Sequence, residues 1–202
     1  MKALGLVVLI SGSGSNLQSI IDAIADKSLN AELRAVISNK ADAYGIKRAK
    51  QAGIPVEIID HKQYSSRESF DTQLTHCIDK YQPQLIVLAG FMRILSNDFV
   101  NYYYGKLINI HPSLLPKYRG LHTHKKALAE GDKQHGLTIH YVSTELDGGP
   151  VILQESVPIL ADDTVESLAQ RVLTQEHISY PKVLQLFAEG RLQLVDNQVI
   201  SN

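Results

Sequence analysis

ALGLVVLISGSGSNLQSIIDAIADK, residues 3–27, is the stretch of sequence that decides the fold. Residues 3–10 are an apolar run of strand length ahead of a Gly/Ser turn, which predicts a buried strand. Leu17, Ile20 and Ile24 then recur at helical spacing, so an amphipathic helix is expected over 16–27. A strand, a turn and a helix in this order are typical of a parallel α/β sheet.

The same alternation continues along the first half of the chain. It predicts strands over 33–38, 56–59, 85–90 and 106–110, and helices over 42–52, 66–81 and 96–103. The run LIVLAG at 85–90 is apolar throughout, which is typical of a strand buried on both faces of a parallel sheet.

The rhythm changes after residue 110. A loop rich in Pro and Gly is expected over 111–123, followed by a helix that ends near Gly131. Two strands, 137–143 and 151–159, are joined by so short a turn that they are predicted to be antiparallel. Helices over 164–178 and 181–189 and one last strand within 191–200 complete the pattern. The sequence therefore predicts a single α/β domain with a doubly wound, mostly parallel sheet and late antiparallel strands.

Composition narrows the classes of function. The 202 residues are 44% hydrophobic and 20% charged, as in an ordinary globular domain. A net charge of −1 lacks the basic excess of a nucleic-acid surface. No run is long enough to cross a membrane, and the apolar start lacks the cleavage pattern of a signal peptide. These features predict a cytoplasmic protein with small-molecule partners.

The Gly/Ser turn at 11–16 (SGSGSN) is a candidate phosphate site. In such sheets ligands bind beyond the carboxyl ends of strands, and a helix N-terminus offers free N–H groups to an anion. The turn is not a dinucleotide fingerprint, because Leu17 stands in place of the third glycine, and it is not a Walker loop. The structural alternative is a tight turn with a capping box made by Ser15 and Gln18.

Asn109 and His111 lie two residues apart at the end of a strand and should point to the same side. An amide can donate to a developing oxyanion, and an imidazole can do the same or move a proton. Asp147, in a glycine-flanked turn, would favour the charged form of His111 if it lay beside it. The alternative is that these side chains only satisfy backbone groups of the loops.

The other reactive residues predict neither a serine or cysteine nucleophile nor a metal site. No Gly-x-Ser-x-Gly elbow is present, and Cys77 falls within a helical pattern, so it is expected to be a packing residue. His122 and His124 could share a metal ion, but no recognisable ligand set completes the pair. No metal site is predicted.

An apolar segment, 91–95 (FMRIL), follows the 85–90 strand directly. Apolar walls with one fixed cation suit a flat heteroaromatic ligand that carries carboxylates. The alternative is the start of a helix packed on the sheet.

Five stretches together carry a resemblance to a known family: 10–17 (ISGSGSNL), 89–95 (AGFMRIL), 109–116 (NIHPSLLP), 120–124 (GLHTH) and 145–152 (ELDGGPVI). In these stretches the chain resembles the glycinamide ribonucleotide formyltransferase family from residue 3 to about 190. The resemblance implies a single Rossmann-like domain over 1–202. Its half at about 1–100 would bind phosphate, and its half at about 101–190 would hold the folate and the catalytic residues.

The same resemblance implies transfer of a formyl group from 10-formyltetrahydrofolate to glycinamide ribonucleotide in purine biosynthesis, by direct attack of the amine and without a metal. Asn109 and His111 would hold the formyl oxygen, and Asp147 would keep His111 charged. The implied substrate contacts are Gly14, Ser15 and Asn16 for the phosphate, Glu176 toward the amine, and Arg67, Met92, Arg93, Ile94, Leu95 and Asn109 for the folate.

Three alternatives stay open at this point. An initiator methionyl-tRNA formyltransferase carries a further C-terminal tRNA-binding domain, and a formyltetrahydrofolate deformylase carries an additional N-terminal regulatory domain. Neither is expected from this length and charge. A non-catalytic folate- or nucleotide-binding module would not need the Asn109, His111 and Asp147 set. A monomer or weak homodimer is expected, with no nucleic-acid or membrane partner.

Overall fold

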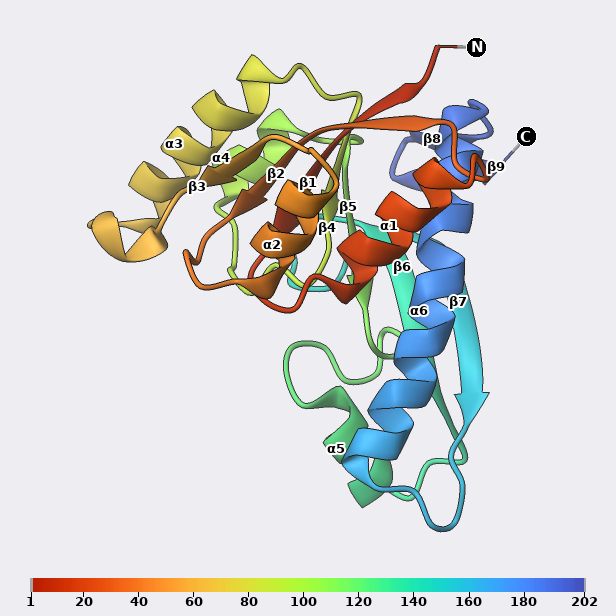
Figure 1. Ribbon diagram of the computed structural model, residues 1–202. Coiled ribbons are helices and arrows are strands. Elements are labelled where there is room, and N and C mark those ends of the chain that lie inside the picture. The colour runs from red at the N-terminus through yellow and green to blue at the C-terminus, as the bar shows by residue number, and fades with distance from the viewer. Residues whose placement is uncertain (1, 202) are drawn as a thin grey trace.

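The computed structural model describes residues 2–201 as a seven-stranded sheet flanked by helices (Figure 1). The strands of the sheet are β1 (Leu4–Ile10), β2 (Ala31–Ser38), β3 (Val56–Ile58), β4 (Leu85–Leu88), β5 (Leu107–His111), β6 (Gln134–Tyr141) and β7 (Val151–Pro158). The helices are α1 (Ser15–Ala25), α2 (Tyr44–Gln51), the short 3-10 helix η1 (His61–Gln63), α3 (Arg67–Lys80), α4 (Asn97–Tyr102), α5 (Thr123–Ala129) and α6 (Val165–Ala188).

The strand order is β3-β2-β1-β4-β5-β6-β7. Strands β1 to β5 pair in parallel, whereas β6 is antiparallel to both of its neighbours. The chain runs outward from β1 to β3 and then returns to place β4 on the other side of β1. The direction of winding reverses there, and in such sheets ligands bind in the crevice beyond the carboxyl ends of the two strands at the reversal, here β1 and β4. The predicted doubly wound sheet with late antiparallel strands is confirmed.

Both faces of β1 are buried, which explains its unbroken apolar run. Leu6 and Val8 belong to one core together with residues of α1, α2 and α6. Val7 and Leu9 belong to the other core, with residues of α3 and α4. Since successive side chains of a strand point to opposite faces, the two helix layers cover opposite faces of the sheet. Figure 1 shows α6 running alongside β6 and β7.

One predicted break is wrong. The sequence predicts two helices, 164–178 and 181–189, but α6 continues without a break between them and through Pro181. Proline removes one N–H and usually kinks or ends a helix. Here the flanking residues are held by packing, because Tyr180, Val183 and Leu184 have no exposed surface. The Tyr180 hydroxyl also donates to the carbonyl oxygen of Leu88, 2.9 Å away.

Two smaller differences lie at loops. The tail forms a two-stranded hairpin, β8 (Leu192–Val195) and β9 (Gln198–Ser201), in place of one strand. Asp196 and Asn197 between them both have positive φ, as a two-residue hairpin turn requires. The capping box of Ser15 and Gln18 is absent, since α1 is capped by Gly14 without a side-chain hydrogen bond. The other predicted strands and helices are present.

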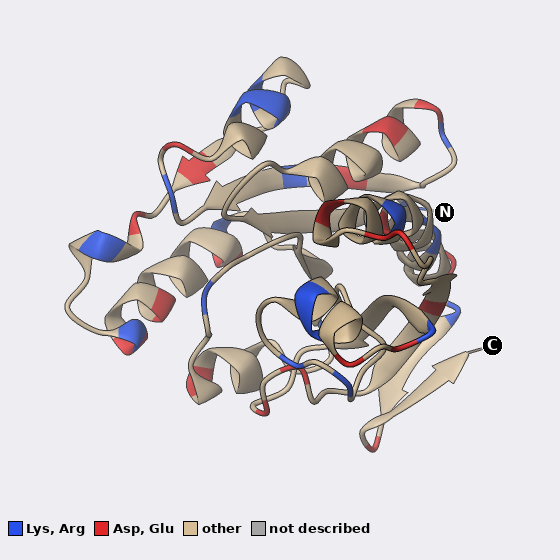
Figure 2. Cartoon of the chain, turned by 90° about the horizontal axis from the view of Figure 1, so that it is seen from below, with Lys and Arg blue, Asp and Glu red and all other residues tan. Residues whose placement is uncertain are grey.

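Across residues 2–201, no helix is long and apolar enough to cross a membrane. Figure 2 shows basic and acidic residues interspersed over the helices and loops on the side that it views.

Candidate active site

Three predicted segments meet at one edge of the sheet. The 11–16 turn follows β1, the 89–95 segment follows β4, and Asn109 and His111 end β5. Because β1, β4 and β5 are parallel neighbours, their carboxyl ends lie side by side. The fold therefore places the predicted phosphate turn, apolar wall and polar pair around one crevice.

The phosphate turn is shaped by close backbone contact. Gly14 has a φ of 68°, and a Cβ on it would lie 2.6 Å from Cα of Gly45 at the start of α2. The Gly45 N–H donates to the carbonyl oxygen of Gly12, 3.0 Å away. With Gly14 at the cap of α1, the N–H groups of Ser15 and Asn16 have no acceptor within the helix. The turn thus presents donors at the positive end of α1, as an anion site needs.

Glu176 reaches this turn from α6. The Asn16 Nδ2 donates to Oε2 of Glu176 over 2.7 Å, and both residues are buried. Burial raises the pKa of Glu176, although the hydrogen bond from Asn16 opposes the shift. Oδ1 of Asn16 is buried and has no hydrogen-bond partner among residues 2–201. Such an atom is costly unless a ligand or water satisfies it.

His111 and Asp147 are close together. Nδ1 of His111 is 3.5 Å from Oδ2 of Asp147, and the two side chains are 7% and 11% exposed. Nε2 of the same ring is 2.9 Å from the carbonyl oxygen of Tyr118. A carboxylate and a carbonyl both accept, so both ring nitrogens satisfy their neighbours only as donors. Both ring nitrogens of His111 therefore face oxygen acceptors.

The Asp147 turn depends on unusual backbone geometry. Asp147 has a φ of 48°, in the left-handed region that Asp tolerates better than most residues. A Cβ at Gly149 would overlap the carbonyl oxygen of Tyr141, so only glycine fits there. The Gly120 N–H donates to Oδ2 of Asp147 over 2.8 Å, which joins this turn to the 111–123 loop. Both loops therefore fix the carboxylate beside His111.

Asn109 lies in the same cluster, and its partner is a residue that sequence reasoning missed. His140 of β6 faces Asn109, with its Nε2 3.3 Å from Nδ2 of the amide. The same Nε2 is 4.0 Å from Oδ1 of Asp147. The sequence shows His140 only as one of several histidines. A prediction of the β5–β6 register would have been needed to identify it.

The apolar wall at 91–95 is irregular and is pinned at both ends. The Met92 N–H donates to Oγ of Ser11 over 2.7 Å, and the Ser11 hydroxyl donates to Oδ1 of Asn39 over 2.6 Å. At the other end, the Ser96 N–H donates to Oδ2 of Asp71 over 2.6 Å. Between these points Met92 and Ile94 are exposed, whereas Leu95 is buried. The wall can present its exposed side chains without losing its shape.

Two arginines belong to this side of the site. Arg93 lies over the ring of Phe70, with its guanidinium carbon 4.8 Å from the ring centroid. Arg67 is exposed in the first turn of α3. Burial raises the pKa of Asp71, and the charges of both arginines oppose that shift, so both lie within electrostatic reach of it. The structure thus brings Arg67 to the neighbourhood of the wall.

The remaining candidates lie elsewhere. Cys77 is buried in α3, where burial raises the pKa of its thiol to about 11, and it packs as predicted. His124 pairs with His135, their ring nitrogens 3.1 Å apart, whereas His122 is exposed at the start of α5. Between residues 2 and 201, no group of three or more His, Cys, Asp or Glu side chains is arranged to hold a metal ion.

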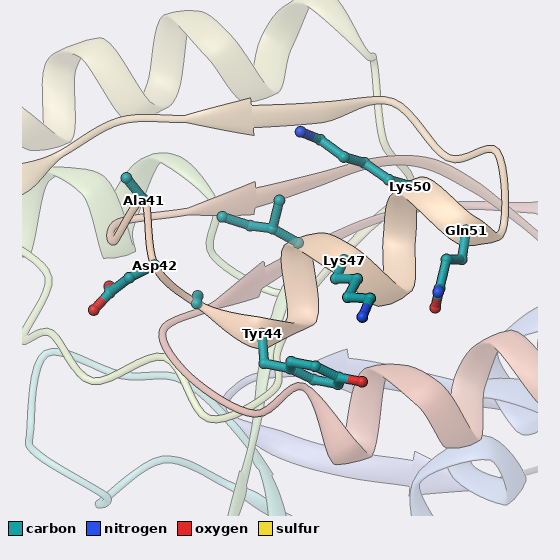
Figure 3. Close-up of a pocket in the computed structure, with 8 residues that line it drawn as sticks. Ala41, Asp42, Tyr44, Lys47, Lys50 and Gln51 are labelled. Atoms are coloured by element: carbon teal, nitrogen blue, oxygen red, sulfur yellow. The ribbon is translucent and has the colours of Figure 1, made fainter.

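A shallow hollow of about 600 Å³ lies on α2 and the loop before it. Figure 3 shows Tyr44, Lys47 and Lys50 projecting from α2 around it. None of the predicted site residues lines this hollow, so it is separate from the crevice.

Comparisons with known proteins identify relatives of the whole chain. Residues 4–184 match the family described as formyl transferase. The phosphoribosylglycinamide formyltransferase of Escherichia coli K12 is 56% identical over 194 residues, which cover 96% of this chain and 92% of that protein. The trifunctional purine biosynthetic protein adenosine-3 of Chironomus tentans is 50% identical over 94% of this chain, which spans only 14% of that longer protein. A solved structure of phosphoribosylglycinamide formyltransferase from Coxiella burnetii, in complex with CHES, is 57% identical with a TM-score of 0.95, covering 98% of this chain and 93% of that one.

Proposed function

The chain belongs to the formyl transferase family, and on this premise we propose that it transfers the formyl group of 10-formyltetrahydrofolate to the amine of glycinamide ribonucleotide. The products are formylglycinamide ribonucleotide and tetrahydrofolate, and the reaction belongs to purine biosynthesis. The folate is a co-substrate. The amine is itself the nucleophile, so the proposed step needs no metal.

In the proposed reaction the amine nitrogen attacks the formyl carbon, and a tetrahedral intermediate forms with its negative charge on the former carbonyl oxygen. The bond from that carbon to N10 of the folate then breaks. The amine loses a proton and N10 gains one, so the net change is transfer of the formyl group and one proton in opposite directions. The site must stabilise the oxyanion and move that proton.

In this proposal Asn109 donates to the oxyanion, Asp147 holds His111 in its charged form, and the Nε2–H of His111 exchanges its contact with the Tyr118 carbonyl for the oxyanion when the substrates are bound. The observation that carries it is the pair of acceptors around the His111 ring, the Asp147 carboxylate at 3.5 Å and the Tyr118 carbonyl at 2.9 Å. A fixed donor beside developing negative charge in a water-poor site is worth several kcal/mol. Asp147 also accepts a proton from a water molecule, which helps to move the proton from the amine to N10.

The substrates take the two sides of the crevice. We assign the phosphate to the N–H groups and side chains of the turn, at Gly14, Ser15 and Asn16, and the amine to the carboxyl of Glu176. The 2.7 Å contact between Asn16 and Glu176 supports this, because one substrate can then touch both. The folate is assigned to the wall at 92–95, with Arg67 as an outer contact and Asn109 at the formyl group.

Residues 1–100 supply the phosphate turn and the wall at 92–95, and residues 101–190 supply the catalytic trio. We expect a monomer or weak homodimer, because the proposed trio comes from one chain, and sedimentation at several concentrations tests this. We propose small-molecule partners only and the cytoplasm as location, where both substrates are soluble.

The test is direct. The purified protein is incubated with 10-formyltetrahydrofolate and glycinamide ribonucleotide, with parallel reactions that contain no acceptor or initiator methionyl-tRNA, and products are identified by mass spectrometry. Formylglycinamide ribonucleotide that appears only with the ribonucleotide is expected. Free formate without an acceptor would indicate a deformylase, formylated tRNA a translation enzyme, and folate binding without turnover a binding module.

A further inference from the structure

A buried histidine links two side chains of the proposed catalytic set. His140 is 2% exposed and pairs with Asn109 across the β5–β6 ladder. Its Nε2 is 3.3 Å from Nδ2 of Asn109 and 4.0 Å from Oδ1 of Asp147. Its Nδ1 is 2.9 Å from the carbonyl oxygen of Tyr141. One rigid ring is thus fixed to the backbone on one side and faces the catalytic groups on the other.

The Tyr141 carbonyl decides which ring nitrogen of His140 carries the proton. A carbonyl oxygen only accepts, so Nδ1 must donate, and in a neutral ring Nε2 is then an acceptor. Burial lowers the pKa of His140, and the charge of His111 acts in the same direction, although the Tyr141 contact and Asp147 oppose them. The neutral ring protonated on Nδ1 is therefore the favoured state.

An acceptor at Nε2 determines how the amide of Asn109 is turned. The NH₂ group can donate to Nε2, whereas the amide oxygen in that place would face a second acceptor. An NH₂ group has two hydrogens. When one is held by His140, the other stays in a fixed direction and is available to a ligand.

We infer that His140 is a positioning residue for formyl transfer, which holds the Asn109 amide so that its second N–H donates to the formyl oxygen. This inference rests on the function proposed above. The neutral state of the ring matters for a second reason. A charged His140 would compete for the Asp147 carboxylate, which lies 3.5 Å from His111.

The kinetic test is a double-mutant cycle with Asn109. His140→Ala is expected to lower kcat about tenfold to a hundredfold, with both KM values within about twofold of the wild type. This is less than the roughly 10²–10³-fold cost of removing an oxyanion donor, because the Asn109 amide is misdirected rather than lost. In the Asn109→Ala background the same substitution is expected to change kcat by less than about threefold, because its target is already gone. An equal loss of kcat in both backgrounds would show a merely structural role and overturn the inference.

Two further variants keep the result interpretable. His140→Gln offers an amide oxygen as acceptor. In the protein that keeps Asn109, its kcat is expected to lie between those of His140→Ala and the wild type. A folded His140→Gln variant with a kcat no higher than that of His140→Ala counts against the inference. His135→Ala is the matched control, because His135 is also buried on β6 but contacts His124 rather than Asn109. Any decrease in kcat that His135→Ala causes should be the same in the wild type and in the Asn109→Ala variant.

The ring itself is tested without turnover. Nitrogen-15 NMR of the wild-type protein near pH 7.5 should show His140 as the neutral tautomer protonated on Nδ1. A charged ring or a proton on Nε2 would overturn the positioning role even if formyl transfer is confirmed. If instead the wild-type protein showed the Nδ1 tautomer but no formyl transfer, the proposed function would be wrong. His140 would then have no formyl-transfer reaction for which to position Asn109.

Discussion

Asn16 and Glu176 are 160 positions apart in the chain and share a hydrogen bond of 2.7 Å between buried side chains. The contact joins the first turn of α1 to the middle of α6, so the phosphate turn and α6 are directly connected. It also leaves Oδ1 of Asn16 without a partner among the described residues. A carboxyl group held beside donors in this way is suited to a ligand that carries both an amine and a phosphate.

Glu176→Gln should separate binding of the ribonucleotide from folding. The amide oxygen can still accept from Asn16, and a buried neutral group replaces a carboxyl whose charged form burial disfavours. We expect unchanged or higher stability and a KM for glycinamide ribonucleotide about ten- to a hundredfold higher, from loss of a charge-assisted contact. Steady-state kinetics and urea unfolding measure both. Glu166→Gln, exposed in the first turn of the same helix, is the control and should alter neither.

His111→Ala and Asp147→Asn should each lower kcat by about 10²–10⁴-fold. Each removes a group that stabilises the oxyanion or helps to move the proton from the amine to N10. The fold should persist, since neither residue belongs to the two apolar cores. Circular dichroism and stopped-flow turnover test the two statements. Near-normal rates in either variant would contradict the assigned mechanism.

Glu145→Gln is the matched control for Asp147. Glu145 lies two residues earlier in the same turn, is exposed and pairs with Arg119. An exposed pair contributes little, so this variant should keep normal turnover and stability within about 0.5 kcal/mol. A large loss of turnover in it would mean that the turn responds to any change of charge.

Gly14→Ala should damage the phosphate turn, whereas Gly12→Ala should not. Gly14 needs positive φ and touches the backbone of Gly45, while a Cβ at Gly12 would meet nothing within 4 Å. We expect a loss of about 1–3 kcal/mol in the free energy of unfolding for Gly14→Ala, with a raised KM for the ribonucleotide. Equal effects of the two variants in urea unfolding and kinetics would contradict this role of the backbone.

The sequence predicted most of the fold because the local signals agree with it. The apolar run before Ser11 and the helical spacing after Asn16 both survive in β1 and α1. Pro181 misled the prediction because a local helix breaker was outweighed by the burial of Tyr180 and its neighbours, which only the tertiary structure supplies.

Prediction of the site has the same limit. The motif around Asn109 and His111 identifies candidates, but the place of His140 follows from strand register, which the sequence does not encode in any short pattern. The bond from Met92 to Ser11 likewise depends on β1 and β4 being neighbours.

Stability should fall in mild acid because of His135. Burial and the neighbouring His124 lower the pKa of His135 from 6.5 to about 4. Between these values the unfolded chain binds more protons than the folded one, so the free energy of unfolding decreases as the pH falls from about 6.5 toward 4. Protonation of His135 in the unfolded chain therefore lowers the free energy of unfolding by about 2 kcal/mol at pH 5 and has no effect above about pH 7.5.

His135→Gln tests this, because glutamine does not titrate. Urea unfolding at pH 7.5 and pH 5 gives the decrease in the free energy of unfolding between the two pH values, and this decrease should be about 2 kcal/mol smaller in the variant than in the wild type. His76→Gln replaces an exposed histidine on α3 and should leave the loss unchanged. If the wild type and His135→Gln lose the same stability over this range, His135 is not the group that carries the effect.

Ser11→Ala should weaken folate binding with little effect on chemistry. The Ser11 hydroxyl is buried, accepts from the Met92 N–H and donates to Asn39, so its loss leaves a backbone donor at the start of the wall without its acceptor. An unsatisfied buried donor costs about 1–3 kcal/mol, and the part that loosens the wall appears as weaker binding. We expect the KM for 10-formyltetrahydrofolate to rise about three- to thirtyfold, with kcat and the KM for the ribonucleotide within about twofold. Ser13→Ala, exposed in the same turn, is the control. If Ser11→Ala raised the ribonucleotide KM instead, Ser11 would act on the phosphate turn rather than on the wall.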